Sequence, residues 1–227
     1  CATACQFYVT TCDPNYTPIN KLRPFEQAYH RQVGPFAPLF RMFGVVPRVT
    51  IEKLEEWERL LFDACTLCGR CEYACPQGVE ILKMMRRART LRERDRVPGP
   101  IHRGVVMDLQ RGNNLGIPKP DFLFLLADLS RELEADGFPG FYVPVDKKGA
   151  NVLVTINSKE PFGEPDDMKF WWRIFYAAKE DWTVPSYNWE GVNWGLFSGD
   201  DESMKTLVGR IVEHMERLEC KTLLLPE

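Results

Sequence analysis

Four closely spaced cysteines in the N-terminal half constrain the fold more than any other feature of the chain. They are separated by two, two and three residues, and Pro76 follows the last of them. The run C-x2-C-x2-C-x3-C-P is typical of a loop that binds a [4Fe–4S] cluster, with three thiolates on one cluster and the fourth on a second. The four are Cys65, Cys68, Cys71 and Cys75. The alternative is a structural zinc site, although zinc prefers two separated C-x2-C pairs.

A second cysteine pair opens the chain. Cys1 and Cys5 are separated by three residues, which is the spacing at the end of another such run. If so, two further cysteines precede Cys1 in the complete protein. The last residues, 221–225, have the pattern of a strand that leads into a loop. We therefore expect the chain to be a piece of a longer protein.

Composition excludes several classes of function. The chain has 227 residues, a net charge of -3 and eight cysteines. This charge does not favour nucleic acid as a partner, and cysteines in metal-type spacing indicate a reducing compartment or a bound cofactor and not a disulfide framework. The longest apolar run, Phe122–Ala127, is far too short to span a bilayer. With three histidines far apart in the sequence, hydrolytic chemistry has little support.

The pattern of apolar residues predicts an α+β protein in two parts. Helices are predicted first, at 25–32, 51–64, 79–96, 102–110 and 122–135, and many prolines between 13 and 48 argue against long helices there. From about residue 141 the pattern becomes strand, helix, short strand, helix, strand, which is typical of a parallel α/β layer. The strands are predicted at 151–156, 182–185 and 221–225, and the helices at 166–181 and 200–218. The predicted domains are therefore a helical two-cluster ferredoxin-like domain at 1–140 and part of an α/β domain at 141–227.

The predicted helix 79–96 is the most basic part of the chain. Its arginines and lysines allow three interpretations, namely a solvated face, a docking face for an acidic redox partner, or a nucleic-acid site. The last is the weakest, because no aromatic residues are interspersed with the charges. Outside the metal-type runs, Cys12 is interpreted as a free thiol and Cys220 as a buried structural thiol.

The chain resembles the D-type heterodisulfide-reductase-like iron–sulfur proteins, and more closely the corresponding component of membrane-linked Dsr-type redox complexes. The resemblance covers nearly the whole chain. It rests on these segments: Cys1–Cys5 with Phe7-Tyr8 and Asp13-Pro14, Cys65–Pro76, Val152–Ser158, Trp182-Thr183, Trp189–Gly191, Gly195–Asp200 and Lys221–Glu227.

The resemblance implies two [4Fe–4S] clusters in the helical domain. One would be held by Cys5, Cys65, Cys68 and Cys71, and the other by Cys1 and Cys75 with the two cysteines expected upstream. It also implies that the second domain is of the CCG type, which binds a further cluster that cleaves or forms a disulfide bond. No CCG motif is present in residues 1–227, so we expect that catalytic cluster outside this sequence, with its catalytic residues unknown.

The implied partners are a membrane b-type cytochrome subunit, other subunits of the redox complex, and a small disulfide-carrying protein or thiol substrate. The location would be cytoplasmic and peripheral to the membrane, through partner subunits and without a membrane span of its own. Two other functions stay open. One is a pure electron relay in a flavin dehydrogenase of the glycolate or glycerol-phosphate type, and the other is a zinc-stabilised interaction module.

Overall fold

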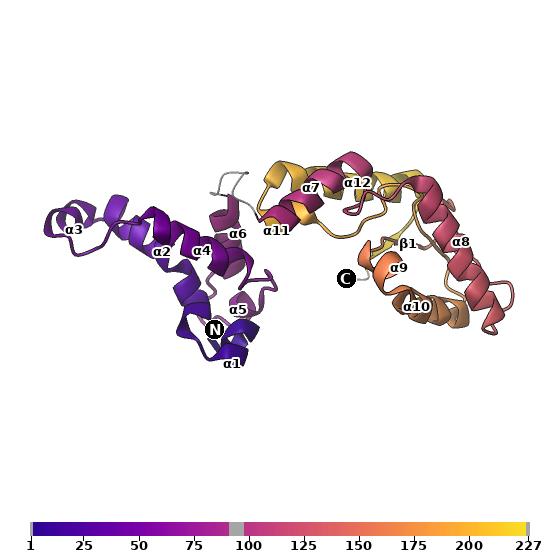
Figure 1. Cartoon of the computed structure of the whole chain (residues 1–227), viewed down its shortest axis with the longest axis horizontal. Coiled ribbons are helices and arrows are strands. Elements are labelled where there is room, and N and C mark those ends of the chain that lie inside the picture. Colours follow the sequence, from indigo (N-terminus) through magenta and orange to yellow (C-terminus); the bar gives the residue numbers. More distant parts are fainter. Residues whose placement is uncertain (1, 91–97, 226–227) are drawn as a thin grey trace. The chain divides into compact units, whose positions relative to one another are not determined.

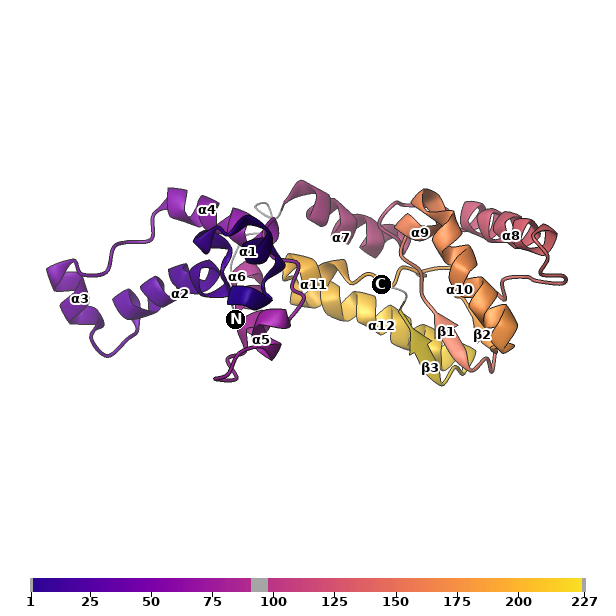
Figure 2. The same ribbon diagram turned by 90° about the horizontal axis from the view of Figure 1, so that it is seen from below.

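The computed structural model describes residues 2–90 and 98–225. The chain is mostly helical with one small parallel sheet, and it divides into two compact units (Figures 1 and 2). Unit 1 comprises Cys1–Pro98 and Phe197–Gly199, and unit 2 comprises Gly99–Leu196 and Asp200–Glu227. The predicted mixture of helices and a parallel sheet is confirmed. The two units meet near residue 98, whereas the predicted domain boundary is at residue 140. Units of this kind are not necessarily domains, so the domain boundary at residue 140 stays a prediction.

Unit 1 is a set of helices and contains all the cysteines of the two metal-type runs. Its helices are α1 (Gln6–Thr11), α2 (Pro18–Gln32), α3 (Ala37–Phe43), α4 (Ile51–Phe62), α5 (Arg70–Tyr73) and α6 (Ile81–Thr90), with 3-10 turns at Ala2–Ala4 and Pro14–Tyr16. Helices α2, α4 and α6 pack against one another. Their buried residues include Trp57 and Leu61 of α4 and Met85 and Ala88 of α6.

The prediction that prolines keep helices short in residues 13–48 was wrong for α2. This helix begins at Pro18, seven residues before the predicted start, and continues through Pro24. Proline fits the first turn because its missing N–H has no helical partner there. Thr17 caps the helix by accepting a hydrogen bond from the Asn20 backbone N–H. Pro24 removes one backbone hydrogen bond, and packing against α4 and α6 holds the helix together.

Helix α4 begins where it was predicted, and α6 covers part of its prediction. Thr50 accepts a hydrogen bond from the Lys53 backbone N–H, which fixes the start of α4. The described part of the basic helix is Ile81–Thr90, and the predicted continuation to residue 96 lies outside the described residues.

Unit 2 contains the sheet and the helices that cover it. Its helices are α7 (Gly99–Arg111), α8 (Lys119–Ala135), α9 (Lys159–Gly163), α10 (Pro165–Ala178), α11 (Trp194–Ser198, whose end belongs to unit 1) and α12 (Asp201–Leu218). Its strands are β1 (Val152–Val154), β2 (Trp182–Thr183) and β3 (Thr222–Leu224). The strands are parallel in the order β2-β1-β3, with Val152 paired to Trp182 on one side and to Thr222 on the other. Strands β2 and β3 lie on opposite sides of β1. Because crossovers between parallel strands are right-handed, helix α10 before β2 and helix α12 before β3 lie on opposite faces of the sheet (Figure 1).

The core of unit 2 is rich in aromatic side chains. Phe122 of α8 stacks on Trp189 with ring centroids 4.3 Å apart, and Trp172 of α10 is fully buried. Phe170 and Ile174 are exposed on the other side of α10, so only one side of this helix contributes to the core.

Unit 2 contains a buried acid on α7. Asp108 of α7 is 3% exposed, and its Oδ1 lies 3.9 Å from Nη1 of Arg210. Burial and the charge of Glu190 raise the pKa of Asp108 to about 7. Glu190 is also buried, and it accepts hydrogen bonds from the backbone N–H groups of Asn114 and Ser158.

The raised pKa of Asp108 predicts that part of the stability of unit 2 is lost as the pH rises. Between pH 4 and 7 the folded state holds a proton on Asp108 that the unfolded state has released, so stability falls through this window. Asp108→Asn removes this dependence. Relative to the native chain, we expect the variant to gain about 3 kcal/mol between pH 5 and 8.

Urea unfolding followed by tryptophan fluorescence measures this effect. Of the six tryptophans, only Trp57 lies in unit 1, so the signal reports mainly on unit 2. The exposed Asp128→Asn is the matched control and should follow the native pH profile. Parallel pH profiles for Asp108→Asn and the native chain would contradict the prediction.

Candidate metal centres

The loop between α4 and α5 brings three cysteines of the first run together. Leu67 and Gly69 have φ angles of 56° and 72°, in the left-handed region that reverses the chain within few residues. Gly69 then caps α5, so Cys65 precedes the turn, Cys68 lies within it, and Cys71 lies in the helix that follows. The carboxylate of Glu72 accepts a hydrogen bond of 2.9 Å from the Leu82 backbone N–H, which ties α5 to the start of α6.

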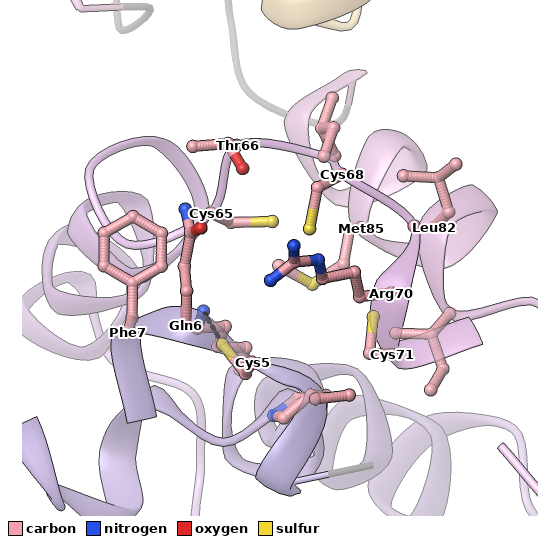
Figure 3. A pocket seen from close by; sticks show the side chains of 16 residues that line it. Cys5, Gln6, Phe7, Cys65, Thr66, Cys68, Arg70, Cys71, Leu82 and Met85 are labelled. Atoms are coloured by element: carbon pink, nitrogen blue, oxygen red, sulfur yellow. Dashed lines mark hydrogen bonds between the residues drawn. The ribbon is translucent and has the colours of Figure 1, made fainter. Parts of the chain in front are cut away.

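Four cysteines line one cavity of unit 1. They are Cys65, Cys68 and Cys71 from the loop and Cys5 from the N-terminal segment. Figure 3 shows their sulfur atoms pointing into a common space, with Cys5 coming from a different segment than the other three. Much of the remaining lining is apolar, including Phe7, Ile81 and Met85, while the side chain of Arg70 also extends into the space. This is the set of four that the resemblance implies for one cluster.

Cys75 lines a different cavity. Its volume is about 580 Å³, and its walls are formed mainly by apolar residues of α2 and α6, among them Leu22, Phe25 and Met84. Pro18 and Ile81 line both cavities, so they form a shared wall between them. Cys1, the other candidate ligand of this chain for the second cluster, lies outside the described residues. The fourth cysteine of the run is thus separated from the first three.

The donor set of the first cavity fits a [4Fe–4S] cluster, because such clusters are held by four cysteine thiolates in weakly polar surroundings. Burial raises the pKa of Cys71, whereas the backbone N–H groups of Val79 and Gln77 lower the pKa of Cys75. Thiols must lose their protons to bind iron, so loading at Cys71 releases a proton at neutral pH. Among the residues that the structure describes, no group of three or more His, Cys, Asp or Glu side chains is placed to hold a single metal ion.

A buried lysine lies beside the first cavity. Lys21 is 2% exposed, and its Nζ donates to Sγ of Cys5 at 3.4 Å and to the backbone oxygen of Ala64. The ammonium also lies 5.0 Å from the centre of the Phe7 ring, and Trp57 Nε1 donates to the Lys21 backbone oxygen. Positive charge beside a cluster stabilises its reduced, more negative state. Lys21 was not predicted from the sequence, where its only signal is a single lysine within a proline-rich segment.

A second buried cation fixes the start of the cysteine loop. Arg89 of α6 is 2% exposed and donates hydrogen bonds to the backbone oxygens of Leu61, Cys65 and Phe197. Its guanidinium also lies 4.7 Å from the centre of the Phe62 ring. Burial lowers the pKa of Arg89 to about 10, which leaves it charged at neutral pH. The interpretation of the basic helix as a solvated face was therefore wrong for Arg89, although it holds for the exposed Lys83.

The two remaining cysteines are Cys12 in unit 1 and Cys220 in unit 2. Cys12 is exposed at the end of α1 and forms no disulfide, in agreement with its interpretation as a free thiol. Cys220 is only half-buried after α12, and burial raises its pKa. Neither is among the residues that line the two cavities.

Comparisons with known proteins agree with this geometry. Residues 1–80 match the family model described as a 4Fe-4S dicluster domain. Two curated proteins, from Archaeoglobus fulgidus and Archaeoglobus profundus, are named "Hdr-like menaquinol oxidoreductase iron-sulfur subunit 2" and "Hdr-like menaquinol oxidoreductase iron-sulfur subunit". The first is 25% identical over 96% of this chain and 40% of its own length, and the second is 26% identical over 97% and 41%. The chain resembles the Hdr-like iron–sulfur proteins.

The predicted resemblance and the two [4Fe–4S] clusters are thus confirmed. Both relatives are named as iron–sulfur subunits of oxidoreductases. The chain spans about two fifths of the length of the curated relatives it matches. No solved structure matches it. No helix within residues 2–90 and 98–225 is long and apolar enough to cross a membrane.

Proposed function

We propose that this chain relays electrons through two adjoining [4Fe–4S] clusters in a membrane-linked, heterodisulfide-reductase-like complex. Cys5, Cys65, Cys68 and Cys71 hold one cluster, and Cys75 and Cys1 contribute ligands to the other. The observation that carries the proposal is the separation of Cys75 from the other three cysteines of its run, with Pro18 and Ile81 between the two cavities. Two clusters bound in these cavities would be separated by the side chains of Pro18 and Ile81, an arrangement that suits electron exchange between them.

The residues around the first cavity have three tasks in this function. The four thiolates bind iron, and the apolar side chains of Phe7, Ile81 and Met85 keep water away from it. Lys21 supplies positive charge at Cys5, which favours acceptance of an electron. When bound, the clusters supply one-electron redox chemistry.

The names of the relatives support menaquinol as the source of the electrons. By the resemblance, a membrane b-type cytochrome subunit would oxidise the quinol and pass electrons to this chain, which would sit at the membrane through its partners. The electrons would then reach a further cluster in a CCG-type domain, where a disulfide of a small protein or thiol carrier is reduced. We place that catalytic cluster in the part of the protein beyond this sequence.

Redox-titrated EPR spectroscopy of the anaerobically purified full-length protein tests this proposal. We expect two reduced cubane signals that broaden each other through magnetic coupling, and a third iron–sulfur signal from the catalytic cluster. Both cubanes should become reduced when a menaquinol analogue is added to the complete complex.

Two results would contradict parts of the proposal. Two cubanes without a third signal, together with no disulfide turnover, would remove the catalytic part and favour a pure relay for a flavin dehydrogenase. Zinc instead of iron, with no absorption band near ~400 nm, would remove the electron-transfer role altogether, because zinc has no redox chemistry.

A further inference from the structure

The segment of residues 31–48, which we call the α3 tip, exposes an unusual amount of apolar surface. Helix α3 packs against α2, and only Ala37 among its apolar side chains is buried. Six large apolar side chains of the tip are between 48% and 73% exposed. They are Val33, Phe36, Leu39, Met42, Phe43 and Val45. Several large apolar side chains exposed within one short segment indicate a site of interaction.

The α3 tip lies at one end of unit 1, a position that suits insertion of its side chains into another surface. Figures 1 and 2 both show α3 at the end of α2 that lies away from α1 and α5. The tip is held in shape by Arg31, which donates a hydrogen bond of 2.5 Å to the backbone oxygen of Val46. Apolar side chains that are exposed on such a short element can be buried by insertion into the interface of a lipid bilayer.

The charge of the tip indicates the nature of that surface. Residues 31–48 contain Arg31, Arg41 and Arg48 and no acidic residue, so the tip carries a charge of +3. The whole chain carries -3, so the other residues together carry -6. Positive charge is thus concentrated where the phenylalanines are exposed. Arginine beside exposed phenylalanine and leucine is the composition of segments that lie in the interface of an anionic lipid bilayer.

We propose that the α3 tip binds directly to the surface of a membrane that contains anionic lipids. The side chains of Phe36, Met42 and Phe43 enter the boundary between headgroups and acyl chains. Arg41 and Arg48, both exposed, stay at the level of the phosphates, because long basic side chains can bury their stems and keep their charge in water. This contact does not depend on the function proposed above, since it needs neither electron transfer nor a partner subunit.

Flotation of the full-length, cluster-loaded protein with lipid vesicles tests the proposal. We expect binding to vesicles of phosphatidylcholine with phosphatidylglycerol, weaker binding to phosphatidylcholine alone, and a decrease as salt is raised. The double variant Phe36→Ser/Phe43→Ser should lower the partition coefficient by at least about tenfold. The matched control is Phe124→Ser/Phe170→Ser, which changes two equally exposed phenylalanines of unit 2 and should bind like the native protein.

A second variant, which reverses the charge of two arginines, tests the proposal even if the double serine variant folds poorly. Arg41→Glu/Arg48→Glu changes only exposed side chains, and it should abolish the preference for anionic vesicles while iron content and EPR signals stay unchanged. Vesicle binding that is absent, or equal in the tip variants and in the unit 2 control, would overturn the proposal. Binding that requires a purified membrane subunit in the vesicles would likewise overturn it, in favour of a protein partner. Because the EPR signals are read separately, neither result bears on the relay function.

Discussion

Replacing Cys68 by serine is expected to remove one [4Fe–4S] cluster and to leave the other in place. Cys68 lines the cavity that also contains Cys5, Cys65 and Cys71, so its loss takes one of four ligands from a single cluster. Iron content should fall by about four atoms per chain. Part of the fold of unit 1 should be lost too, because the free energy of metal binding is also folding free energy. Iron analysis and EPR spectroscopy of the full-length protein measure both effects.

A matched pair of variants makes this result specific. Cys75→Ser should remove the cluster of the other cavity, so the cluster that remains should differ in midpoint potential from the one left by Cys68→Ser. Cys12→Ser, at an exposed cysteine, should keep both clusters. If Cys68→Ser and Cys75→Ser left the same cluster, the assignment of Cys75 to a separate site would be refuted. Unchanged iron in Cys68→Ser would refute the ligand itself.

Replacing Arg89 by methionine is expected to destabilise unit 1 strongly. Methionine keeps much of the apolar stem but leaves the backbone oxygens of Leu61, Cys65 and Phe197 without their donor. Buried acceptors without a partner are costly, so we expect a loss of about 3 kcal/mol or more. Because one of these oxygens belongs to Cys65, the cluster of the first cavity should also be released more easily. Denaturant titration followed by the visible absorbance of the clusters measures both.

The control for Arg89→Met lies on the same helix. Lys83 is exposed and pairs with Glu80 on the surface, so Lys83→Met should change stability by less than about 1 kcal/mol. Equal midpoints for Arg89→Met and Lys83→Met would show that the buried hydrogen bonds of Arg89 contribute little.

The parts of the fold that were predicted correctly follow from local patterns. The start of α4 is set by Thr50, and the strand β1 is a short run of apolar residues between polar ones, so the neighbouring residues determine both. The family resemblance implied that Cys5 joins the later cysteines at one cluster, and the structure places Cys5 at the same cavity. The presence of two clusters was therefore predictable from the sequence.

What could not be predicted depends on contacts between distant residues. Arg89 resembles its exposed neighbours in the sequence, and only the carbonyls of a loop more than twenty residues away distinguish it. Lys21 is buried because the Ala64 carbonyl and Cys5 meet at its ammonium. Pro24 within α2 escaped prediction for a similar reason, since packing against α4 and α6 compensates for the missing hydrogen bond.

The wall formed by Pro18 and Ile81 also affects the rate of electron transfer between the two proposed sites. An electron that passes between the proposed clusters crosses this wall, and the rate of such a transfer falls steeply with the thickness of the material in between. Both side chains are apolar and exclude water, whose dipoles would otherwise have to reorient as the charge moves. The speed of the relay would then depend in part on two residues that bind no iron.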